Sequence, residues 1–234
     1  MGRVVDLFGV EHATDSPGSH FLWMDCMDGM AQFPDKFFEL AIVDPPYGLD
    51  RYKKNDGGNS EKIRCFGDKD KNWNNEKPSD KYFEELFRIS KSQIIWGANN
   101  FTLPTSEYFI IWDKQQMMPS FARCEMAWTN CKVPAKIYAH RSQDDNRIHP
   151  TQKPVALYKW LLSNYAKPGD KILDTHVGSA SSLIACHQMG FEYWGFELDT
   201  DYYKAATERL NKAKAQVSIT ELIEPPQIDQ IKIV

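Results

Sequence analysis

The feature that most constrains the fold is the alternation of short apolar runs with segments of helix length. Apolar runs typical of strands occur at residues 21–24, 38–43, 93–96, 109–112, 133–139, 171–173 and 193–196. Segments with helical character occur at residues 81–89, 154–165, 179–189 and 201–215. Because parallel strands need crossover connections, which are usually helical, this alternation predicts an α/β fold with a mostly parallel sheet. A length of 234 residues fits one such domain, spanning residues 1–234.

An acid, two prolines and an aromatic ring follow the apolar run that ends at Val43. They form the motif Asp44-Pro45-Pro46-Tyr47. The prolines remove two backbone donors and stiffen the turn. Open α/β folds bind ligands at the carboxyl edge of the sheet, where this motif is expected. An acid and a ring there can hold a flat heterocyclic amine, with its amino group bound by Asp44, although the motif alone also fits a structural turn.

A loop of small residues follows the run at 171–173. It reads Asp174-Thr175-His176-Val177-Gly178-Ser179-Ala180-Ser181. Small residues let the backbone approach a ligand closely, and the start of the next helix offers free N–H donors. Glu197 ends the following apolar run, where an acid binds ribose hydroxyls. The pair predicts a site for an adenosine-type cofactor, although a plain strand-to-helix turn fits the loop alone equally well.

The loop favours S-adenosylmethionine over NAD. Ala180 stands where a dinucleotide-binding G-x-G-x-x-G loop would have another glycine. Asp174 would repel a pyrophosphate, but it suits the ammonium of a methionine moiety.

Composition excludes several classes of protein. The net charge is −4, which disfavours a structural DNA-binding protein but not an enzyme with one basic cleft. The five cysteines form no Cys-x-x-Cys pair, so neither a disulfide framework nor a metal site is expected. No apolar run approaches the roughly 18–20 residues of a membrane span, and a cytoplasmic location is expected.

Three segments, in their order along the chain, resemble the β group of amino DNA methyltransferases. They are Asp44-Pro45-Pro46-Tyr47, His149-Pro150-Thr151-Gln152-Lys153-Pro154, and the loop from Asp174 to Ser181 with Glu197. The resemblance covers most of residues 20–210. It implies a Rossmann-like methyltransferase fold with a mostly parallel seven-stranded sheet flanked by helices. It also implies a circularly permuted order, in which the strand at 21–24 continues the sheet beyond the strand at 193–196.

The resemblance assigns roles to individual residues. It makes Asp44, Pro45, Pro46 and Tyr47 catalytic. The residues that it implies for the cofactor are Asp25, Cys26, Asp44, His149, Thr151, Lys153, Asp174, Thr175, His176, Gly178, Ser179, Ala180, Ser181, Glu197 and Leu198. Within this set, Asp25 and Cys26 would contact the cofactor adenine, and Thr151 and Lys153 its methionine carboxylate. Glu125 is assigned no role.

Contacts with DNA are expected in a long irregular loop at residues 49–79. The residues expected to make them are Arg51, Lys53, Lys54 and Arg64. A short stretch at 113–147 leaves room for only a small target-recognition region. Similar proteins are often dimers, which leaves a homodimer open, although the sequence does not reveal the oligomeric state.

The implied activity is methylation of the exocyclic N6 amine of adenine in DNA, with S-adenosylmethionine as methyl donor and the base flipped out of the helix. Asp44 favours adenine, because cytosine enzymes of this family more often have Ser there. Methylation of cytosine N4 or of RNA remains open. So does a non-catalytic relative that binds cofactor and DNA, because Thr175, His176 and Ala180 depart from the family's usual Asp-Pro-Phe-x-Gly-Ser-Gly loop.

Overall fold

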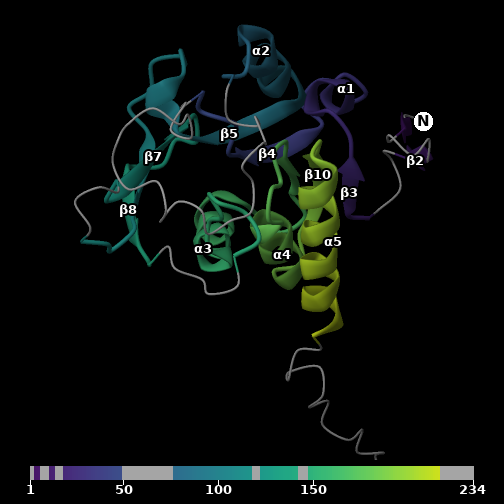
Figure 1. Ribbon diagram of the computed structural model, residues 1–234. Coiled ribbons are helices and arrows are strands. Elements are labelled where there is room, and N and C mark those ends of the chain that lie inside the picture. Colours follow the sequence, from purple (N-terminus) through teal and green to yellow (C-terminus); the bar gives the residue numbers. More distant parts are fainter. Residues whose placement is uncertain are drawn as a thin grey trace, which may run out of the picture.

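An eight-stranded sheet between two layers of helices forms the centre of the molecule (Figure 1). The computed structural model describes residues 3–5, 11–13, 18–48, 76–117, 122–141 and 147–216. Within these ranges, no helix has the length and apolar character needed to cross a membrane. Arg51, Lys53, Lys54 and Arg64, which were expected to contact DNA, lie outside the described residues.

The strands of the main sheet lie in the order β3-β10-β9-β4-β5-β7-β6-β8. Their bounds are β3 (His20–Trp23), β4 (Phe38–Val43), β5 (Ser90–Trp96), β6 (Phe109–Asp113), β7 (Cys124–Thr129), β8 (Lys136–Ala139), β9 (Lys171–Asp174) and β10 (Glu192–Glu197). All of the pairings are parallel except the two that β7 makes, with β5 and β6. A separate antiparallel pair is formed by β1 (Arg3–Val5) and β2 (Glu11–Ala13).

Helices cover both faces of the sheet. Their bounds are α1 (Cys26–Met30), α2 (Asp80–Ile89), α3 (Val155–Tyr165), α4 (Ser181–Gln188) and α5 (Thr200–Ala215), with a 3-10 turn η2 (Ala98–Asn100) after β5. Helices α3, α4 and α5 lie on one side of the sheet and α1 and α2 on the other (Figure 1).

Strand β4 shows why the sheet is covered on both faces. Leu40 and Ile42 are buried in the core beneath α3, α4 and α5, whereas Ala41 and Val43 are buried in the core beneath α1 and α2. Successive side chains of a strand point to opposite faces, so a strand that is apolar at every position needs a layer on each side. The continuous apolar run in the sequence therefore reflects the central position of β4.

The sheet differs from the expected one in number and direction of strands. It has eight strands rather than seven, and it is mixed because β7 is antiparallel. The expectation missed β7, because its sequence Cys-Glu-Met-Ala-Trp-Thr contains an acid and has three half-buried or exposed positions at its start. The expected parallel character holds for the other seven strands.

The chain reverses its direction of winding between β9 and β4. The path from β9 through α4 to β10 leads to one edge of the sheet, and the path from β4 through α2 to β5 leads to the other. Ligands of open α/β sheets bind in the crevice outside the carboxyl ends of strands at such a point. The motif after β4 and the loop after β9 are therefore brought to the same crevice.

Candidate active site

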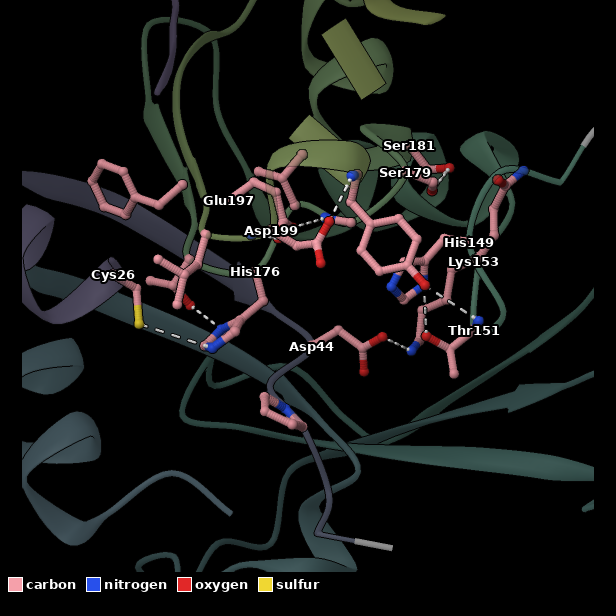
Figure 2. Close-up of a pocket in the computed structure, with 18 of the residues that line it drawn as sticks. Cys26, Asp44, His149, Thr151, Lys153, His176, Ser179, Ser181, Glu197 and Asp199 are labelled. Atoms are coloured by element: carbon pink, nitrogen blue, oxygen red, sulfur yellow. Dashed lines mark hydrogen bonds and ion pairs between the residues drawn. The ribbon is translucent and has the colours of Figure 1, made fainter. Parts of the chain in front are cut away.

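A cavity of about 630 Å³ opens at the carboxyl ends of β3, β4, β9 and β10 (Figure 2). This volume is typical of sites for small organic ligands. Most of the residues predicted from the sequence line it, namely Asp25, Cys26, Asp44, Pro46, His149, Thr151, Lys153, Thr175, His176, Gly178, Ser179, Ser181, Glu197 and Leu198. Four predicted residues do not line it, namely Pro45, Tyr47, Asp174 and Ala180.

Both oxygens of the Asp44 carboxylate have protein partners. The Tyr47 hydroxyl donates a hydrogen bond of 2.5 Å to Oδ1, and the Lys153 ammonium pairs with Oδ2. Burial and the Asp44 charge raise the pKa of Tyr47 well above its usual value, so the phenol stays protonated and acts as the donor. Figure 2 shows the Asp44 side chain pointing toward Lys153 across the lower part of the cavity.

The Tyr47 ring is held against a glycine. A Cβ atom on Gly97 would lie 2.2 Å from the nearest ring carbon of Tyr47, and the backbone φ of Gly97 is +69°. Both the contact and the left-handed backbone require glycine here. Phe101, just after η2, meets the same ring edge-on at a centroid distance of 6.0 Å.

Lys153 lies between two carboxylates. Its Nζ contacts Asp44 and lies 3.2 Å from Oε2 of Glu125, on β7. Glu125 Oε1 in turn lies 2.5 Å from Lys114 Nζ. The Lys153 side chain is 2% exposed, so its charge is balanced by these carboxylates rather than by solvent. No role for Glu125 follows from the sequence, because only the sheet pairing brings β7 to this edge.

Asp174 supports the loop and does not face the cavity. It is 2% exposed, and its carboxylate accepts hydrogen bonds from the Ser182 hydroxyl and, at 3.0 Å, from the His176 backbone N–H. Burial raises the pKa of Asp174 to about 7 despite these two hydrogen bonds. The predicted contact between Asp174 and a ligand ammonium therefore has no support in this geometry.

The Thr175 hydroxyl and the His176 ring belong to a buried polar chain. Thr175 Oγ1 lies 2.7 Å from the Tyr82 hydroxyl and 2.9 Å from His176 Nδ1, and His176 Nε2 lies 3.9 Å from Cys26 Sγ. Burial lowers the pKa of His176 to about 4 and raises that of the Cys26 thiol to about 12. Both groups are consequently neutral at pH 7, and they form an uncharged wall of the cavity (Figure 2).

Glu197 ties the loop to the end of β10. Its carboxylate accepts hydrogen bonds from the backbone N–H groups of Gly178 at 2.8 Å and Asp199 at 2.9 Å. Burial is the main cause of its raised pKa. A carboxylate has about four lone-pair sites, so these two bonds leave acceptor capacity toward the cavity.

The last turn of the loop is held by an arginine from α5. The Arg209 guanidinium donates to the Ser179 carbonyl at 2.6 Å and to the Ser181 hydroxyl at 2.9 Å. Between them, Ala180 has a left-handed backbone with φ +61° and is fully buried. An alanine is unusual in this conformation, which glycine adopts without steric cost.

His149 and Thr151 approach the loop from the segment before α3. The His149 ring packs edge-on against Tyr202 at a centroid distance of 4.3 Å, and Thr151 Oγ1 lies 3.1 Å from His149 Nδ1. A Cβ atom on Gly178 would meet the His149 ring at 3.5 Å. The His149 ring thus packs directly over the glycine of the loop.

At the other end of the cavity, Asp25 caps α1. Its Oδ1 accepts a hydrogen bond of 2.7 Å from the Met27 backbone N–H. Leu198, which follows β10, is 57% exposed and offers an apolar surface to a ligand.

The charges that line the cavity favour a cationic ligand. Four carboxylates contribute to its wall, those of Asp25, Asp44, Glu197 and Asp199, against the single ammonium of Lys153. Eight lining residues were not predicted from the sequence, namely Met24, Gln152, Tyr158, Val177, Phe196, Asp199, Thr200 and Tyr202. Among the described residues, no group of three or more His, Cys, Asp or Glu side chains could hold a metal ion.

The sequence is similar to those of known DNA methylases. Residues 111–208 match the N6/N4 DNA methylase family. The chain is 26% identical over 212 residues to YubD of Escherichia coli (strain K12), covering 82% of this chain and 90% of that protein. It is 24% identical over 261 aligned positions to the type II methyltransferase M.HinfI of Haemophilus influenzae, covering 87% of this chain and 72% of that protein.

Solved structures share the fold. The complex of M1.HpyAVI with SAM has a TM-score of 0.53 and 19% identity, over 82% of this chain and 98% of that one. The cytosine-N4-specific PvuII DNA methyltransferase has a TM-score of 0.55 and 14% identity, over 85% of this chain and 91% of that one. The chain is therefore similar to N6/N4 DNA methylases over part of its length, and it has the α/β fold of solved methyltransferases.

Proposed function

We propose that this chain is an S-adenosylmethionine-dependent DNA methyltransferase that modifies the N6 amine of adenine. One observation carries the proposal: the Asp44 carboxylate and the loop at 174–181 meet in one cavity, although 130 residues separate them in the chain. The family match and the methyltransferase relatives support the same activity.

The cavity fits the proposed cofactor. S-adenosylmethionine carries a sulfonium charge, which suits a wall with four carboxylates and one ammonium. Glu197 would bind the ribose hydroxyls, and Asp25 with Leu198 would hold the adenine. When bound, the sulfonium supplies an activated methyl group.

Asp44 would act on the amine that receives the methyl group. The lone pair of an exocyclic amine is delocalised into the ring, so the amine is a weak nucleophile. Hydrogen bonds from its two N–H groups to Asp44 and to the Pro45 carbonyl would favour a pyramidal nitrogen. The lone pair then becomes available for in-line attack, and Asp44 stabilises the positive charge that develops on the nitrogen.

Tyr47 would have to move when the base enters. Its hydroxyl donates to Oδ1 of Asp44 and would compete with the amine for this carboxylate. The base must also leave the duplex to reach the cavity. A ring released from Asp44 can stack on the flipped base, a contact that contributes about 1–3 kcal/mol.

The assignment of adenine as the target base rests on Asp44, the acid of the motif Asp44-Pro45-Pro46-Tyr47. Cytosine-N4 methylation is the second candidate, because the cytosine-N4-specific PvuII enzyme has the same fold.

The position of β3 beside β10 supports a circularly permuted order. The basic residues Arg51, Lys53, Lys54 and Arg64 remain the proposed DNA contacts.

Product analysis tests the proposal. The purified chain is incubated with methyl-labelled S-adenosylmethionine and unmethylated DNA, and the digested nucleosides are identified by mass spectrometry. We expect N6-methyladenine, and a loss on the order of 10³-fold for Asp44→Asn with cofactor affinity retained. N4-methylcytosine as the sole product would contradict the adenine assignment, and a label found only in RNA would contradict the DNA assignment.

A further inference from the structure

The buried lysine in the cavity has an arrangement that cofactor binding does not require. The Lys153 ammonium contacts Asp44, the proposed catalytic carboxylate, on one side and Glu125 on the other. It lies 3.5 Å from the Tyr47 hydroxyl and 5.5 Å from the centroid of the Trp96 ring, which is fully buried. Asp44, Glu125, Tyr47 and Trp96 therefore surround the Lys153 ammonium and fix its position.

Strand pairing explains how Glu125 reaches this place. Strand β7 runs antiparallel to β5, with Ala127 opposite Trp96 at the carboxyl end of β5. Glu125 lies two residues nearer the start of β7, on the same face of the strand as Ala127. That places Glu125 at the carboxyl edge of the sheet, where Asp44 follows β4.

Lys153 interacts with both carboxylates, and Lys114 pairs with the second oxygen of Glu125. A lysine paired with Asp44 alone would neutralise it and weaken it as a hydrogen-bond acceptor for the substrate amine. A second carboxylate on the same ammonium divides that interaction, so Asp44 keeps more of its strength as an acceptor. A buried lysine with a single partner would also be less strongly held in its charged form, because burial penalises the charge.

We propose that Glu125 is a positioning residue that acts through Lys153 to fix the orientation and the acceptor strength of the Asp44 carboxylate. The inference rests on the proposed methyl transfer. It does not place Glu125 against substrate or cofactor, since Glu125 does not line the cavity. Lys114 completes the arrangement from the outer side, at 2.5 Å from Glu125 Oε1.

A kinetic cycle tests the inference. Glu125→Gln keeps the shape of the side chain and removes its charge. We expect kcat for DNA methylation to fall about 10- to 100-fold, while KM for S-adenosylmethionine and its affinity by calorimetry stay within about twofold. Glu39→Gln is the matched control, because Glu39 accepts from Lys91 and from the Lys171 backbone at the other end of β4. Its kcat should equal that of the wild type.

A double variant tests whether Glu125 acts through Lys153. In a Lys153→Met background, adding Glu125→Gln should cause no further loss of kcat, because the link to Asp44 is already absent. Losses that multiply in the double variant would overturn the inference. So would a Glu125→Gln variant that behaves like Glu39→Gln, or one that loses cofactor affinity together with kcat.

The experiment separates the two proposals. A wild-type protein that methylates DNA while Glu125→Gln matches its control contradicts only the role of Glu125. A wild-type protein that transfers no methyl group to any base contradicts the proposed function and this inference together. Circular dichroism and urea unfolding of each variant identify a loss of kcat caused by misfolding. A Glu125→Gln variant that is unfolded would show Glu125 to be structural and would overturn the inference.

Discussion

The two sides of the cavity are stabilised in different ways. On the side of β4, charged groups fix one another, with Asp44, Lys153, Glu125 and Lys114 in an alternating chain. On the side of β9, Cys26 and His176 form a wall that is uncharged at neutral pH, while the backbone of the loop is held by the side chains of Asp174, Glu197 and Arg209.

The difference follows from what each side is proposed to do. A group that must accept a hydrogen bond from a reacting amine needs a retained charge, and a buried charge needs partners. A loop that approaches a cofactor closely needs a fixed backbone, and hydrogen bonds between its N–H and C=O groups and the side chains of Asp174, Glu197 and Arg209 fix it. This contrast can be tested by substitutions on each side of the cavity.

On the side of β4, the substitution Gly97→Ala should disrupt the packing of the Tyr47 ring. The new Cβ would lie 2.2 Å from the Tyr47 ring and would displace the ring that is proposed to stack on the flipped base. We expect a loss of about 1–3 kcal/mol in the free energy of unfolding from the clash, in addition to backbone strain, and at least a 10-fold fall in kcat. Urea unfolding and methylation assays measure the two effects.

Gly190→Ala is the control for backbone strain alone. Gly190 has a similar φ of +74°, but no atom lies within 4 Å of its added Cβ. This variant should lose only about 1 kcal/mol and keep full kcat. Equal losses of kcat in both variants would show that the Tyr47 contact has no part in catalysis.

Two residues of the loop after β9, Asp174 and His176, should make the stability of the protein depend on pH in opposite directions. Burial raises the pKa of Asp174 from 3.8 to about 7, so its contribution to stability is present at low pH and is lost as pH rises toward 7. Burial lowers the pKa of His176 from 6.5 to about 4, so its contribution is present above pH 6.5 and is lost as pH falls toward 4.

Replacing either residue should leave the pH dependence caused by the other unopposed between pH 4 and 7. Asp174→Asn should make the free energy of unfolding rise more steeply with pH than in the wild type, and His176→Asn should make it fall. One titrating proton changes this slope by at most about 1.4 kcal/mol per pH unit. Urea unfolding at several pH values measures the slopes, and parallel curves for all three proteins would contradict the proposed neutral wall.

The backbone of the loop should respond to Ala180→Gly. Ala180 has φ +61° and lies in the turn held by Arg209. Glycine removes the strain of this left-handed conformation, so the variant should gain about 1 kcal/mol in the free energy of unfolding. Ala205→Gly within α5 is the control, and it should lose about 1 kcal/mol. A loss in both variants would show that Ala180 is not strained.

Much of the site could be predicted because its residues follow apolar runs. Asp25, Asp44, Thr175 and Glu197 each lie at or just beyond the end of a strand, and parallel strands bring such ends to one edge. Asp174 follows the same pattern but turns inward to Ser182, and a position in the sequence does not reveal the direction of a side chain.

The sequence by itself determined the α/β class and the two motifs that meet in the cavity. Both are encoded locally, by apolar periodicity and by adjacent residues. Only the tertiary structure decided the eighth strand, the antiparallel direction of β7 and the meeting of Glu125 with Lys153. These depend on hydrogen bonds and charges between residues far apart in the chain, and no local pattern specifies which strand lies beside which.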